Sequence, residues 1–259
     1  MTDPIRLDAD TATCAGLVHR SDPDRFRAIM AAPPAARAVL FPLYAFNLEV
    51  ARAPWVTKET MIAEMRLQWW RDAIDEIANG GRVRRHEVVC PLARFLPPDL
   101  APVLDTLIVM RRWDIYTDPF EDQDHFDAYI DATSGGLFWV AGHVLGDADE
   151  QAMRDVGWAA GVANWLRAVP ELEARKRIPL VDGTDEGLHQ LAGRARDRLR
   201  AARAARDRIP RAAALAGWQT ESILRAVRRD PRRVRQGVLV HSTAMQRFSL
   251  MWQAGTGRW

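Results

Sequence analysis

The densest group of side chains that could do chemistry is the acidic stretch DPFEDQD, residues 118–124. Asp118, Glu121, Asp122 and Asp124 offer the hard oxygen ligands that Ca²⁺ and Mg²⁺ prefer. Their spacing and the lack of glycine do not fit an EF-hand loop. Carboxylates directly before a helix also stabilise its N-terminus, because the helix dipole is positive there. We therefore predict that this loop caps the helix that follows it.

Other reactive residue types form no constellation. The six histidines are scattered, and Cys14 and Cys90 lie far apart without the spacing of a metal site. This pattern predicts reduced thiols in the cytoplasm and no serine-, cysteine- or zinc-based active site. The net charge of +2 gives no reason to expect nucleic-acid binding. The N-terminus carries no visible signal peptide, and no apolar run approaches the ~20 residues of a membrane span. We expect a cytoplasmic protein, at most peripheral on the inner face of the membrane.

Arginine supplies nearly all of the basic charge, since Lys58 and Lys176 are the only lysines. Arginines interleave with alanines between Gly187 and Ile209, where Leu188, Leu191 and Leu199 would form the inner face of a helix. One interpretation is attraction to anionic lipid or to an acidic partner. The alternative, a solvated arginine face, is the one that we favour.

The stretch from Arg37 to Trp55 has the spacing of a helix. Val39, Leu43, Phe46 and Val50 recur at intervals of three and four residues, which makes an apolar stripe. Pro54 lacks an amide donor, so the helix should kink or end there. Similar patterns predict further helices over 57–77, 99–117, 126–146, 149–169, 187–209, 212–227 and 238–252. The sequence thus predicts an all-α protein with a single domain over 1–259, of which residues 1–10 are loose.

The segment YAFNLEVARAPW resembles the first signature of the squalene/phytoene synthase family. Tyr44, Ala45 and Phe46 match that signature. The family next has aspartates that hold Mg²⁺, which neutralises the leaving diphosphate. At those positions this chain has Ala51, Arg52 and Trp55.

A second segment, GVANWLRAVPELEARKRIPL, resembles the second signature of the same family. Asn164, Arg167 and Arg177 align, whereas Ala168 and Leu172 stand at the aspartate positions. We predict that Pro170 interrupts the helix and that Glu171 and Glu173 lie mostly off the metal-binding face. Both aspartate clusters are therefore absent by independent substitutions.

Two further resemblances leave alternatives open. Arg111, Arg112 and Asp114 resemble a family motif near the cavity mouth, but a solvated, ion-paired surface fits equally well. Gly135 and Gly136 resemble a glycine pair in a cavity helix. They would permit either a kink beside a ligand or close helix packing.

The resemblance implies an isoprenoid-synthase-type helical bundle around a central apolar cavity. It implies no catalytic residue and no metal site, and we expect the family's Mg²⁺ to be lost, so that no cofactor is needed. The side chains that it would place in the cavity are Tyr44, Asn47, Arg52, Asn164, Arg167 and Arg177.

Three hypotheses for function follow. A retained scaffold without metal ligands resembles a non-catalytic branch of the family that includes a mitochondrial assembly factor of respiratory complex I. The first hypothesis is thus an assembly factor whose partner is a complex I subunit or intermediate. The second is a metal-free binder of a prenyl lipid, with Arg52, Arg167 and Arg177 on a diphosphate. The third is an active prenyltransferase that forms squalene- or phytoene-like products.

Overall fold

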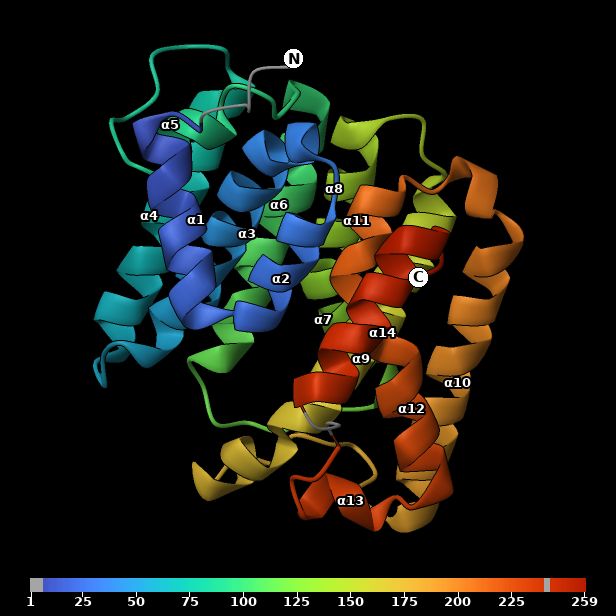
Figure 1. Cartoon of the computed structure of the whole chain (residues 1–259). Helices are drawn as coiled ribbons and strands as arrows, with labels where there is room; N and C mark the ends of the chain where they lie inside the picture. The colour runs from blue at the N-terminus through green and yellow to red at the C-terminus, as the bar shows by residue number, and fades with distance from the viewer. Residues whose placement is uncertain (1–6, 240–242) are drawn as a thin grey trace.

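Helices make up all of the regular structure in residues 7–239 and 243–259, the part of the chain that the computed structural model describes. The all-α prediction is confirmed for these residues. Figure 1 shows a bundle with α1 and α4 along one edge, α10 along the other, and α3, α6, α8 and α9 between them. The longer helices are α1 (Ala9–Ser21), α2 (Pro23–Ala31), α3 (Arg37–Arg52), α4 (Thr60–Ala78), α6 (Ala101–Met110), α7 (Gln123–Ile130), α8 (Gly136–Leu145), α9 (Glu150–Ala174), α10 (Asp185–Ala204), α12 (Thr220–Arg229) and α14 (Thr243–Thr256).

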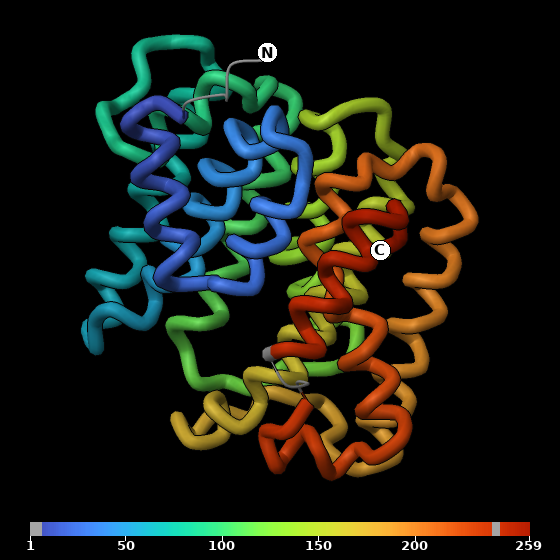
Figure 2. The backbone as a smooth tube through the Cα atoms, viewed as in Figure 1, coloured from blue at the N-terminus to red at the C-terminus, as the bar shows by residue number. Residues whose placement is uncertain are grey.

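Shorter segments connect these helices. Figure 2 shows that the C-terminal third of the chain forms the side of the bundle opposite α1 and α4. No helix in the described part of the chain combines the length and the apolar character needed to cross a bilayer. The short helical segments include α5 (Val89–Leu92), α11 (Arg211–Ala214), α13 (Arg232–Arg235), the 3₁₀ turns η2 (Ala53–Trp55), η4 (Arg111–Asp114) and η7 (Leu215–Gly217), and the π-helical turn η5 (Asp131–Gly135).

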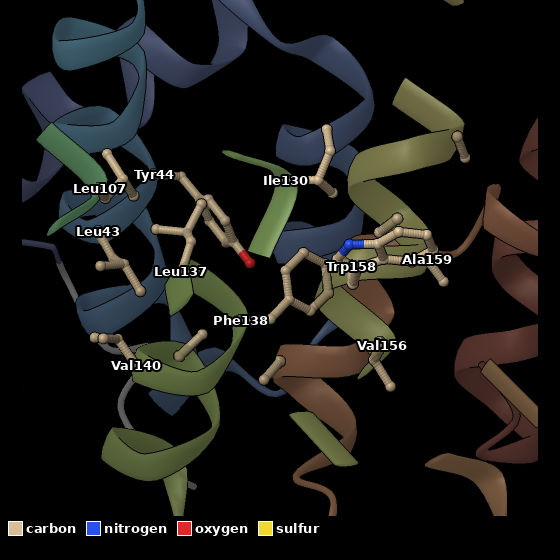
Figure 3. Packing of buried hydrophobic residues seen from close by; sticks show 14 of the residues in the cluster. Leu43, Tyr44, Leu107, Ile130, Leu137, Phe138, Val140, Val156, Trp158 and Ala159 are labelled. Atoms are coloured by element: carbon tan, nitrogen blue, oxygen red, sulfur yellow. The ribbon is translucent and has the colours of Figure 1, made fainter. Parts of the chain in front are cut away.

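Helix α3 lies in the core and packs against α1, α5 and α8. Leu43, Phe46 and Val50 of the predicted stripe are fully buried, but Tyr44 on another face is buried as well. Figure 3 shows Leu43 and Tyr44 beside Leu107, Leu137 and Val140. The prediction of a helix is right. The helix is buried on more faces than the predicted stripe, because neighbouring helices cover it on several sides. It ends at Arg52 and continues as the 3₁₀ turn that contains Pro54.

Helix α9 runs without interruption through Pro170, so the prediction of a break there is wrong. Proline removes only one amide donor from the helix. The buried side chains of Val169 and Leu172 hold this part of α9 against the bundle. The amides of Arg175 and Arg177 then close its end by donating to the carbonyl oxygens of Glu171 and Leu172.

Two glycines of α9 allow it to approach the π-helical turn closely. A Cβ at Gly157 would lie 2.7 Å from the carbonyl oxygen of Ser134, and one at Gly161 would lie 2.7 Å from the Cβ of Ser134. The Ser134 hydroxyl donates to the Gly157 carbonyl at 2.7 Å. A Cβ at Gly136 would come within 2.9 Å of Val103. Gly136 is therefore needed for helix packing, while the π-turn itself distorts the backbone beside the site described below.

Several predicted boundaries change. Helix α1 begins at Ala9 with Asp8 as its N-cap, so residues 7–10 are ordered by capping, while residues 1–6 lie outside the described part. The helix predicted over 57–77 begins at Thr60 and ends at Ala78, and the Thr57 hydroxyl before it accepts the Glu59 amide at 3.1 Å. The helix expected over 99–117 ends at Met110. The last helix runs over Thr243–Thr256, and residues 240–242 of the predicted range 238–252 lie outside the described part. The acidic loop does cap α7, because Asp122 accepts the His125 amide at 2.8 Å.

Candidate functional site

A cavity of about 720 Å³ opens between α2, α3, the π-helical turn, α9 and the segment 215–223. Its apolar wall includes Ile130, Leu137 and Ile223. Three tryptophans, Trp55, Trp165 and Trp218, also line it.

Four of the six side chains expected in the cavity line it: Asn47 and Arg52 from α3, and Asn164 and Arg167 from α9. Helical spacing explains the pair on α9, since Asn164 and Arg167 are three residues apart and share a face. Tyr44 and Arg177 do not line the cavity and instead lie behind its wall. Tyr44 is buried, with the guanidinium of the cavity residue Arg25 lying 4.5 Å from its ring centre. Arg177 is buried against Trp55, 5.2 Å from that ring centre.

All five arginines that line the cavity are paired with a carboxylate. Arg25 pairs with Asp22 at 3.5 Å, Arg167 with Asp24 at 3.3 Å and Arg111 with Asp114 at 3.2 Å. Arg52 lies 3.1 Å from Glu49, and Arg175 lies 2.6 Å from Glu171. The cavity thus neutralises its own positive charge, and a bound anion would have to compete with these carboxylates.

A buried polar cluster consists of Asp114, Tyr129, Arg111 and Arg177. The Tyr129 hydroxyl donates to both Asp114 carboxylate oxygens at 3.0 Å and accepts from Arg111 Nη1 at 2.7 Å. Arg177 donates to the Asp114 carbonyl oxygen. Burial raises the pKa of Asp114 against the opposing effect of Arg111, and it lowers the pKa of Arg177. The solvated-surface interpretation of this motif is therefore wrong for Asp114, which is buried where it lines the cavity. It is right for Arg112, which is exposed and pairs with Glu64 at 2.7 Å.

Three cavity side chains retain buried polar atoms that make no hydrogen bond within the described residues. These atoms are the side-chain oxygen of Asn47, the amide nitrogen of Gln219 and Nε of Arg111. An unsatisfied buried polar atom costs about 1–3 kcal/mol. Gln219 is held in place by Arg167, which donates to its oxygen at 3.1 Å. The cavity therefore offers a donor and an acceptor to an occupant, in addition to its apolar wall.

The five positions at which the resemblance places aspartates all line this cavity: Ala51, Arg52, Trp55, Ala168 and Leu172. None of them carries an oxygen ligand. In the described residues, no group of three or more histidines, cysteines, aspartates or glutamates is placed to hold a metal ion. Glu171 reaches the cavity mouth, contrary to the expectation from its spacing, but it is exposed and paired with Arg175.

Sequence reasoning missed the contribution of α2 and of the segment after α11. Asp24 reaches Arg167 across 143 positions of the chain, and Gln219 reaches it across 52. No local pattern marks either residue. Only the approach of α2 and the 215–223 segment to α9 brings them to the cavity.

The helical architecture and the cavity place the protein among the isoprenoid-synthase-type folds. Superposition on solved structures supports this assignment. A dehydrosqualene synthase superposes with a TM-score of 0.73 at 15% identity over 96% of both chains. The squalene synthase HpnC from Alicyclobacillus acidocaldarius gives 0.69 at 17% identity, over 91% of this chain and 97% of that one.

The family model for squalene/phytoene synthase matches residues 18–183, and the chain belongs to this family. Two curated relatives are named for another role. The complex I assembly factor 6 homolog of Drosophila melanogaster is 25% identical over 92% of this chain and 80% of its own length. Complex I assembly factor 6 of Bos taurus is 24% identical over 64% of this chain, and the match spans about half (51%) of the bovine protein.

Proposed function

We propose that this protein assists the assembly of a respiratory NADH dehydrogenase, complex I, by binding one of its subunits or an assembly intermediate. The names of the fly and bovine relatives point to this role. The observation that carries it is the cavity lining: all five positions assigned to metal-binding aspartates face the cavity, and none is a carboxylate.

The chemistry of the family explains why that observation matters. A diphosphate leaves only when several negative charges are neutralised, and Mg²⁺ on carboxylates provides this. Ala51, Ala168 and Leu172 offer no ligand, and Arg52 repels a cation. The scaffold remains, and in this proposal it serves recognition.

Deletion of the gene in its own host tests the role. We expect NADH-dependent electron transfer in isolated membranes to fall severalfold, while succinate-dependent transfer stays unchanged. Re-expression of the chain should restore the first activity, and affinity capture should retain a complex I subunit. Normal NADH-dependent activity in the deletion strain refutes the proposal. Mg²⁺-dependent release of pyrophosphate from farnesyl or geranylgeranyl diphosphate would instead revive the prenyltransferase hypothesis.

A second candidate is that of a metal-free prenyl-lipid binder, which the apolar wall and the unpartnered atoms of Asn47 and Gln219 favour. The earlier assignment of Arg52, Arg167 and Arg177 to a diphosphate fits less well. Arg52 and Arg167 are already paired with carboxylates, and Arg177 lies behind the cavity wall. An uncharged head group, such as an alcohol, suits this site better.

Tryptophan fluorescence titrations with farnesol and with farnesyl diphosphate test the candidate. Farnesol should bind at least about tenfold more tightly, since the diphosphate must displace existing ion pairs. Ala168→Trp, which fills the cavity, should abolish binding, whereas Ala201→Trp on the exposed side of α10 should not. Equal binding by both tryptophan variants excludes the cavity as the site.

A further inference from the structure

Helix α14 has its apolar face on the outside. Met245, Phe248, Met251 and Trp252 are 57%, 65%, 73% and 54% exposed. Residues at these positions cover one continuous arc of a helix, because each residue advances it by about 100°. Figure 1 shows this helix running along the front of the bundle, next to α2 and α12.

The face of α14 that points toward the bundle is largely polar. Gln253 donates to the carbonyl oxygen of Trp218 and to the Ser249 hydroxyl, both at 3.0 Å. Leu250 is the buried apolar residue of this helix. Beyond the helix, Arg203 Nη2 donates to the Trp259 carbonyl oxygen at 3.0 Å. Polar bonds therefore hold the helix with its hydrophobic stripe directed outward, opposite to the usual orientation of a surface helix.

The charge of the surrounding chain is strongly asymmetric. Residues 211–259 contain nine arginines and two carboxylates, Glu221 and Asp230, which is a formal charge of +7. The preceding 210 residues contain 27 basic and 32 acidic side chains, a charge of −5. Several arginines of the C-terminal segment are exposed and form no ion pair with a carboxylate in the described part of the chain: Arg211, Arg228, Arg229, Arg247 and Arg258.

The arginines of α10 differ in this respect. Arg194, Arg196 and Arg198 pair with Asp127, Glu221 and Asp155 at 2.8, 2.8 and 3.8 Å. The predicted inner face of Leu188, Leu191 and Leu199 is buried, as are Ala195 and Ala202. Ion pairing thus makes α10 a poor candidate for binding an anionic surface, although its arginines are the most conspicuous in the sequence.

We propose that α14 docks this protein on an anionic lipid bilayer. Phe248 and Trp252 enter the headgroup region together with Met245 and Met251, while the arginines of residues 211–259 attract the lipid phosphates. Aromatic and apolar side chains flanked by arginine are the features of helices that lie in a membrane interface. The attraction is electrostatic in part, so it weakens as salt screens the charges. This inference does not depend on the assembly role, since vesicle binding and complex I activity are measured separately.

Flotation of the purified full chain with vesicles tests the proposal. We expect binding to vesicles that contain phosphatidylglycerol, at least about tenfold weaker binding to pure phosphatidylcholine, and a loss of binding at high salt. The double variant F248S/W252S should bind the anionic vesicles about tenfold more weakly, because each change removes an inserted aromatic side chain. Its thermal midpoint should stay close to that of the wild type, since both residues are exposed.

A matched control lies on α4, at one edge of the bundle (Figure 1). Met61 and Met65 of α4 are 75% and 66% exposed, so M61S/M65S removes a similar apolar pair. Helix α4 has four acidic and two basic side chains, and we expect this control to bind as the wild type does. The proposal fails if F248S/W252S binds like the wild type or if both double variants lose binding equally. It also fails if α14 instead joins two copies, so that the wild type is a dimer and F248S/W252S a monomer without vesicles.

Discussion

Glu221 connects α12 to α10 through two arginines of α10 and also pairs with one arginine of α12, and its removal should measurably destabilise the fold. Its carboxylate accepts from Arg196 at 2.8 Å and from Arg225 at 3.1 Å, and lies 3.4 Å from Arg203. The Glu221 side chain is 23% exposed and that of Arg196 is 22% exposed, so solvent screens this pair only in part. Arg225 is mostly exposed and should contribute little.

Glu221→Gln keeps the shape of the side chain but removes its charge. Hydrogen bonds to charged groups contribute about 1.5–3 kcal/mol each, so we expect a loss of about 2 kcal/mol in the free energy of unfolding. For a chain of this size, that corresponds to a fall in Tm of roughly 4–8 °C. Urea denaturation measures the loss. Glu171→Gln is the matched control, because its pair with Arg175 is 70% and 48% exposed and should contribute at most about 0.5 kcal/mol.

The effect should depend on pH. Burial raises the pKa of Glu221, but hydrogen bonds from Arg196 and Arg225 outweigh it, so the pKa in the folded protein is lowered. The stabilisation by Glu221 is therefore complete above the pKa of about 4.3 that a glutamate has in the unfolded chain. It is lost as the pH falls through the lower pKa of Glu221 in the folded protein. The difference between wild type and Glu221→Gln should be constant near neutral pH and shrink below about pH 4. A difference that does not change with pH, or an equal loss in Glu171→Gln, refutes this reasoning.

Two further predictions concern packing and metal binding. Gly157→Ala should lower the free energy of unfolding by about 1–3 kcal/mol, because the new Cβ meets the backbone of the π-helical turn. Gly193→Ala in α10, where nothing lies within 4 Å of a new Cβ, should raise the free energy of unfolding by up to about 1 kcal/mol. Chemical denaturation measures both variants, and a Gly157→Ala variant more stable than Gly193→Ala would contradict the packing argument. Chelation with EDTA should leave Tm unchanged and added Mg²⁺ should not raise it, because the cavity positions that would hold the ion are not carboxylates. A rise in Tm on Mg²⁺ addition in differential scanning calorimetry would reveal a metal site.

The sequence by itself determined which segments are helical and much of what faces inward. The repeat of Leu67, Trp70, Ile74 and Ile77 predicts the inner face of α4, and all four are buried. It also determined the chemistry at the family's aspartate positions, since Ala51 or Leu172 cannot bind Mg²⁺ in any fold. These properties are local: they depend on residue type and on the period of the helix.

Only the tertiary structure decided which charges meet and which face of α14 is free. Asp24, Arg167 and Gln219 meet because α2, α9 and the 215–223 segment converge, and no local pattern encodes contacts between residues so far apart in the chain. Helix α9 continues through Pro170 because packing offsets the missing amide bond, which a local rule cannot foresee. The same holds for α14. Its sequence shows an apolar stripe but does not say whether the stripe faces the bundle or the outside, and the hydrogen bonds of Gln253 direct it outward.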